Sequence, residues 1–70
     1  MMPLSMVNIG EVKTVQKVTG KDETRLFLEN LGFVEGSDVT VVSKIAGNMI
    51  VNIKDTRVAI DRSMANRIMV

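Results

Sequence analysis

Gly32 separates two segments of opposite character, and this single residue most limits how the chain can fold. Before it, Leu28 and Leu31 are three residues apart, which is the spacing of one face of a helix. A helix commonly ends at a glycine in the left-handed conformation, because any side chain there adds a steric cost. After it, Gly36 predicts a second turn, and the β-branched run at residues 39–42 is typical of a strand. The sequence therefore predicts a corner at which a helix turns into a strand.

The chain is too short for more than one domain and lacks the usual means of reinforcing a small one. It has 70 residues, no cysteine and no histidine, which excludes disulfides, thiolate zinc sites and Ser-His or Cys-His nucleophile pairs. A chain of this length buries only about 60% of the surface that its unfolded form exposes. Because 46% of its residues are apolar, we expect one domain over residues 1–70, held together by a closed apolar core.

Hydrophobic periodicity predicts one helix and several short strands. The helix begins at Thr19 or Asp22, since either side chain can cap it, and its buried face is expected to include Phe27 beside the two leucines named above. Leu26 has no place on that face. Strands are expected over residues 11–18, 38–45, 49–53, 57–60 and 67–70, with a tight turn at Gly47 and one helical turn after Asp61.

The expected strands are consecutive and antiparallel, and closing their sheet requires that its two edge strands also pair with each other. An open sheet would present unpaired edges at both ends, and such edges promote aggregation. Pairing of the last strand with the first removes them. The sequence therefore predicts a mainly β fold, a small SH3-like barrel of about five antiparallel strands with one α-helix across it.

The charge pattern and the scarcity of aromatic residues argue against nucleic-acid binding. Nine basic and eight acidic residues are mixed along the chain and give a net charge of +1, so no basic face is expected. Barrels that bind single strands use aromatic stacking platforms. The only aromatic residues are Phe27 and Phe33, which we expect in the core.

Neither a catalytic nor a cofactor-binding pattern is present. The four serines have no imidazole to act as base, and no GxxxxGK[ST] phosphate loop occurs. The eight carboxylates lack the spacing of a calcium or transition-metal site, so we predict no metal, no cofactor and no enzymatic activity. The N-terminal segment has neither the basic start nor the apolar run of a signal peptide or membrane span. We therefore expect a cytoplasmic protein that does not insert into the membrane.

Four separated pieces of the sequence together resemble a known family. They are Leu28-x-x-Leu31-Gly32-Phe33-x-x-Gly36-x-x-Val39, then Gly47, then Val58-Ala59-Ile60, and finally Ala65-x-x-Ile68-x-Val70. Their order and spacing are similar to those of the FeoA family, small SH3-like proteins of bacterial ferrous iron uptake, and the likeness covers nearly the whole chain. Two positions depart from the family pattern, since Glu35 stands where proline is frequent and Asp61 where a basic residue is frequent.

The resemblance implies a function as well as a fold. It implies a non-enzymatic cytosolic accessory or regulatory protein that binds the cytosolic GTPase domain of the FeoB membrane transporter. Two alternatives remain: a small barrel that binds RNA or a ribosomal surface, and a stand-alone relative of the C-terminal domain of metal-dependent repressors. The residues expected to be critical for the fold are Leu28, Leu31, Gly32, Phe33, Gly36, Ala65 and Ile68.

Apolar residues that the core does not need are candidates for partner binding. Leu26 on the helix, with Arg25 beside it, and Met49 and Ile50 next to the Gly47 turn are such residues. Interfaces are commonly anchored by a few apolar or arginine side chains. We expect these four residues to form one exposed docking surface if the helix and the hairpin lie close together, although burial under the curved barrel fits the sequence equally well. Self-association is left open.

Overall fold

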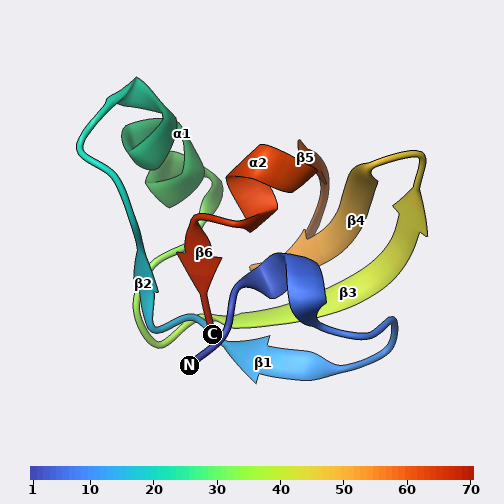
Figure 1. Ribbon diagram of the computed structural model, residues 1–70. Helices are drawn as coiled ribbons and strands as arrows, with labels where there is room; N and C mark the ends of the chain where they lie inside the picture. The colour runs from blue at the N-terminus through green and yellow to red at the C-terminus, as the bar shows by residue number, and fades with distance from the viewer.

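The computed structural model describes all residues 1–70 and shows a small barrel made of two antiparallel sheets (Figure 1). In chain order its elements are the 3₁₀ helix η1 (Leu4–Met6), β1 (Val12–Thr14), β2 (Lys17–Val18), α1 (Glu23–Leu31), β3 (Asp38–Ile45), β4 (Asn48–Ile53), β5 (Thr56–Asp61), α2 (Arg62–Ala65) and β6 (Ile68–Met69). One sheet has the strand order β1-β3-β4-β5, and the other pairs β2 with β6. The prediction of a mainly β barrel with one longer helix is confirmed.

The segment predicted as one strand over residues 11–18 is instead two strands in different sheets. β1 pairs with β3, whereas β2 pairs with β6. Val15 lies between them, is fully buried, and donates its N–H to the carbonyl of Ser37 at 2.8 Å. The chain breaks its pairing here because one short segment must join both sheets, which raises the strand count from the expected five to six.

The ends of the chain close the barrel. Met2 and Val70 exchange two backbone hydrogen bonds of 3.0 and 2.8 Å, and the N–H of Gln16 donates to the carbonyl of Met69 at 2.7 Å. The two termini accordingly lie side by side in Figure 1. The predicted pairing of the last strand with the first segment is confirmed, with β2 as the partner of β6.

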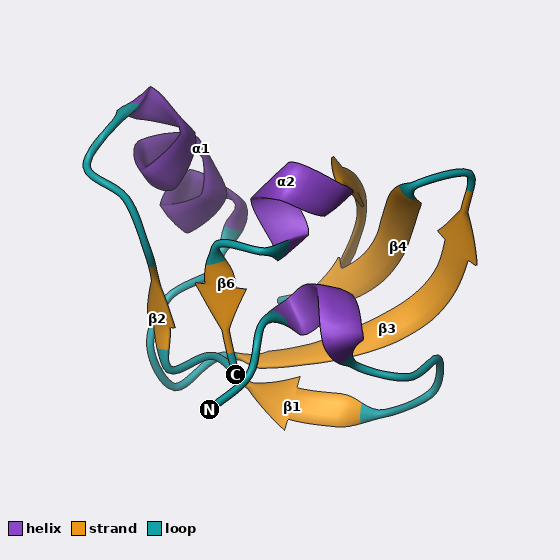
Figure 2. Cartoon of the chain, viewed as in Figure 1, coloured by secondary structure: helices purple, strands orange, loops and turns teal.

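The two α-helices, α1 and α2, begin and end where the sequence indicates, whereas the 3₁₀ helix η1 was not predicted (Figure 2). The carboxylate of Asp22 accepts the backbone N–H of Arg25 at 3.4 Å, and that of Asp61 accepts the N–H of Met64 at 2.8 Å, so each aspartate caps its helix. Gly32 ends α1 in the left-handed conformation, with φ 115°, and its N–H bonds to carbonyls of the last turn. The predicted helix end at this glycine is confirmed.

Two hairpins connect the strands of the larger sheet through turns of two residues. Ala46 and Gly47 join β3 to β4 with φ values of 46° and 87°, and Lys54 and Asp55 join β4 to β5 with 49° and 62°. Positive φ at both turn residues matches the twist of antiparallel strands. The registers of the hairpins follow from these turns.

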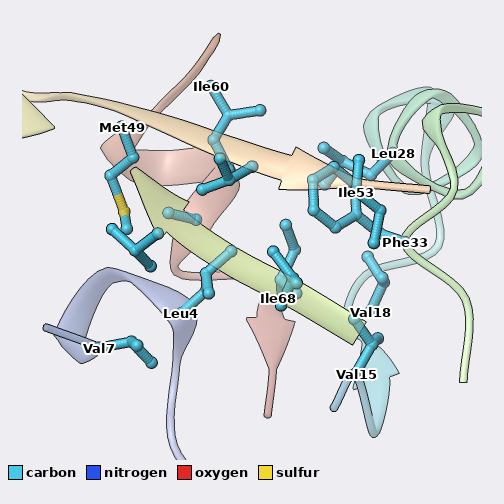
Figure 3. Packing of buried hydrophobic residues seen from close by; sticks show 14 residues of the cluster. Leu4, Val7, Val15, Val18, Leu28, Phe33, Met49, Ile53, Ile60 and Ile68 are labelled. Carbon is cyan, nitrogen blue, oxygen red and sulfur yellow. The ribbon is translucent and has the colours of Figure 1, made fainter. Parts of the chain in front are cut away.

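Fourteen apolar side chains form one buried core (Figure 3). Leu4 and Val7, from η1 and the residue after it, are fully buried, so the N-terminal segment completes the core together with the strands. The residues expected to be critical for the fold are placed as follows: Leu28, Phe33, Ala65 and Ile68 are fully buried, Leu31 packs partly buried against the core, and Gly32 and Gly36 occupy positive-φ turns.

Candidate docking surface

The exposed face of α1 carries two large apolar side chains. Leu26 is 61% exposed and Phe27 is 50% exposed, so the prediction that Phe27 lies in the core is wrong. Successive helical residues are rotated by about 100°, and the face that contacts the barrel is fixed by Leu28 and Leu31. This rotation leaves Leu26 opposite the core and Phe27 on the flank of the helix.

Arg25 lies on the flank of α1 opposite Phe27, with Leu26 between the two, and contacts within its own segment restrict its side chain. Its Nη1 donates to the carbonyl of Gly20 at 3.2 Å, and its Nε lies 3.6 Å from Oε1 of Glu29, one helical turn ahead. We call the group Arg25, Leu26 and Phe27 the helix surface. It combines two exposed apolar side chains with an arginine whose position is restricted. Side chains of these types commonly anchor protein interfaces.

An ion pair connects the start of α1 to the segment before β6. Nη1 and Nη2 of Arg67 donate to Oδ1 and Oδ2 of Asp22 at 2.6 and 3.0 Å. The N–H of Thr19 also donates to the carbonyl of Arg67 at 2.8 Å. The hydrogen bond from Arg67 lowers the pKa of Asp22, and the same bond raises the pKa of Arg67. These contacts fix the direction in which the helix surface points.

The hairpin residues do not join this surface. Met49 is only 4% exposed, so the prediction that it is an exposed contact residue is wrong. Figure 3 shows Met49 and Leu28 at opposite ends of the core, and β4 therefore places the hairpin turn far from α1. Ile50, half-buried, lies on the outer face of the sheet, where Ile45 is 59% exposed. Whether Arg25, Leu26 or Ile50 contacts a partner stays a prediction.

The sequence analysis identified only one of the strongly exposed apolar residues, Leu26. It missed Phe27 and Ile45, and also Met1, Met6, Ile9 and Val12. A helical projection centred on Leu28 and Leu31 would have placed Phe27 on the flank. Ile45 gave no such signal, because a bulge between Val41 and Ser43 shifts the register of β3. Only the paired strands reveal which way the residues beyond the bulge face.

The outer face of the sheet also holds an open polar depression of about 780 Å³. Its lining has no apolar residue and includes two acidic and two basic side chains: Asp38, Asp55, Lys54 and Arg57. No three acidic side chains come together in an arrangement that could hold a metal ion. None of the helices has the length and apolar character of a membrane span.

Comparison with known proteins shows which family this sequence matches and which solved structures share its fold. The sequence model of the FeoA domain family matches residues 2–70. FeoA of Stenotrophomonas maltophilia, solved in complex with zinc and described as a prokaryotic SH3 domain protein, is 29% identical with a TM-score of 0.88, and the match covers 99% of this chain and 88% of that one. FeoA from Chlorobium tepidum is 26% identical with a TM-score of 0.88, and 97% of this chain and 67% of that one are covered. The predicted SH3-like fold is thereby confirmed.

A repressor domain has the same fold. A manganese-dependent transcriptional repressor is 22% identical with a TM-score of 0.85, and the match covers 94% of this chain and 38% of the repressor. At this level of identity the likeness shows the fold alone. No curated protein matches the chain.

Proposed function

Because the chain belongs to the FeoA family, which is associated with ferrous iron transport, we propose that it is a non-enzymatic cytosolic accessory protein of a FeoB-type iron transporter. In this proposal it docks on the cytosolic GTPase domain of the transporter and carries out no reaction itself. The relative from Stenotrophomonas maltophilia is described as a candidate ferrous iron transport activating factor, which supports the role.

The observation that carries the proposal is the helix surface. Leu26 and Phe27 stay at least half exposed although the core is filled without them. Complete burial of a leucine or phenylalanine side chain contributes about 1.5–3 kcal/mol, so covering the exposed part of each would contribute about 1 kcal/mol. Together with Arg25, the helix can supply the central contacts of a modest interface.

The helix is also ordered before any partner binds. The paired Asp22 and Arg67 hold its first turn, and the pair of Arg25 and Glu29 restricts the arginine. Binding by a preformed surface avoids the entropic cost of ordering side chains and loops. Met49 is excluded from this surface by burial, and Ile50 belongs to a different face, so we place the docking contacts on α1 alone.

The proposal is tested by measuring capture of a FeoB-type cytosolic domain by surface-exposed variants. Leu26→Glu and Phe27→Glu are expected to weaken binding by at least about tenfold, because each places a charge where an apolar contact is needed. The matched control is Ile45→Glu, which introduces the same charge at a residue of similar exposure, 59%, on the larger sheet.

Circular dichroism should show that all three variants remain folded, since none of the three side chains belongs to the core. Normal capture by both helix variants would refute the helix surface as the docking site. Failure of the unaltered protein to bind in any nucleotide state at low salt would refute direct binding to that domain.

A further inference from the structure

The outer edge of β5 is unpaired. The strand order of the larger sheet places β5 last, with β4 on one side only. None of the backbone hydrogen bonds formed outside the helices and strands involves residues 56–61, so no loop pairs with this edge. An unpaired strand edge is a ready template for pairing with another strand.

The hairpin turn determines which residues of β5 present their backbone groups at this edge. In a two-residue turn of this type, the residues that flank it, Ile53 and Thr56, form a hydrogen-bonded pair, and the pairing then alternates along the antiparallel strands. Thr56, Val58 and Ile60 therefore bond to β4. Arg57 and Ala59 direct both their N–H and C=O groups outward. Asp61 directs only its N–H outward, because its carbonyl accepts the first hydrogen bond of α2. All three residues are exposed.

These three residues form a self-complementary pattern. If β5 pairs antiparallel with a second β5 so that Ala59 lies opposite Ala59, then Arg57 lies opposite Asp61 on both sides of the twofold axis. Opposite charges that face each other across strands stabilise a sheet, whereas like charges destabilise it. The residue at the axis is alanine, which leaves room for its symmetry mate. Symmetric contacts of this kind are the most common in homodimers.

The charges at the edge remain available for such contacts. Arg57 forms no salt bridge within the chain, and only its Nε is engaged, by the side chain of Asn52 at 3.3 Å. Asp61 uses Oδ1 to accept from Met64 and Ser63, and no hydrogen bond within the chain involves its Oδ2. A guanidinium and a carboxylate oxygen are thus both free to pair with a second molecule.

We propose that two copies of this chain associate through β5, as an antiparallel pair centred on Ala59. The other free edge, β1, has only three residues, with Lys13 as its one charge, and has no self-complementary register. Charged residues usually protect an edge strand from pairing, but here the twofold symmetry turns them into attractive pairs. One strand pair without a large apolar contact forms a weak and reversible dimer, and the helix surface stays outside it.

The register can be tested with a single cysteine, because the chain has none. Ala59→Cys places one thiol on each copy next to the proposed axis, and Glu35→Cys places it on an exposed loop elsewhere. With a short bis-maleimide, Ala59→Cys should form a covalent dimer of twice 7.7 kDa much faster than Glu35→Cys. Equal rates for the two variants would overturn the proposal.

The charge pairs are tested by sedimentation equilibrium of the unmodified chain. The mean mass should rise towards that of a dimer as the protein approaches about 1 mM, and added salt should lower it. Arg57→Asp places an aspartate opposite Asp61 of the second copy on each side of the axis, so this variant should remain monomeric. Lys44→Asp makes the same charge change away from the edge and should behave like the unaltered chain. A monomer at the highest concentration, or a dimer that Arg57→Asp leaves intact, would overturn the proposal.

Discussion

Replacement of Gly32 by alanine tests the helix-to-strand corner on which the fold depends. At φ 115° the backbone is in the left-handed region, where a side chain costs about 1–2 kcal/mol. A Cβ would also lie 3.3 Å from Cγ1 of Ile53 and 3.2 Å from Cδ of Lys54. The lysine is exposed and can move, but Ile53 is fully buried in the core, and overpacking there costs about 1–3 kcal/mol. We expect Gly32→Ala to destabilise the protein by about 2–5 kcal/mol, the sum of these two costs.

Gly36 provides the matched control. Its φ is 88°, and nothing lies within 4 Å of the position that a Cβ would take. Gly36→Ala should therefore cost only the conformational part, about 1–2 kcal/mol. The difference between the two variants isolates the contact with Ile53.

The assay is denaturant unfolding followed by circular dichroism, with the free energy of unfolding taken from the midpoint and slope. A domain of this size has a total stability of about 3.5–10 kcal/mol, so Gly32→Ala should lose a large fraction of it. Equal destabilisation by both variants would refute the steric argument. An unchanged midpoint for Gly32→Ala would refute the requirement for a glycine at the end of α1.

Three further outcomes are expected. Ile68→Ala should cost about 2–5 kcal/mol in denaturant unfolding, because it removes buried contacts of the closing strand, and an unchanged midpoint would contradict that closure. The pKa of Asp22 is lowered from 3.8 by the hydrogen bond from Arg67, so its stabilising contribution is complete above that pH and is lost as the pH falls through the lower folded-state value. Acid unfolding should thus be less steep for Asp22→Asn, and identical acid profiles would argue against the ion pair. Anaerobic calorimetry should show no stoichiometric binding of Fe²⁺ or Mn²⁺, because the ligands are scattered carboxylates without imidazole or thiolate, and a micromolar event would contradict this.

Features encoded within a few neighbouring residues could be predicted from the sequence. The cap at Asp22, the end of α1 at Gly32 and the short helix after Asp61 all depend on local hydrogen bonds and on the φ that glycine permits. The exposure of Leu26 is of the same kind, since the helical rotation from Leu28 determines it.

The tertiary structure decided the features that depend on strand pairing. Met49, Val51 and Ile53 alternate with Ile50 and Asn52, but the apolar Ile50 leaves this strand with apolar residues on both sides. Pairing with β3 and β5 turns Met49 and Val51 inward and leaves Ile50 on the outer face. The distance between α1 and the hairpin turn, and with it the extent of the docking surface, followed from that packing.

The sequence by itself determined the helix, its caps, the turns and the mainly β character, because these depend on interactions between residues close in the chain. The tertiary structure decided the split of residues 11–18 between two sheets, the burial of Leu4 and Val7 and the free edge of β5. Each of these depends on contacts between residues far apart in sequence. Their energies depend on burial and pairing that no local pattern records.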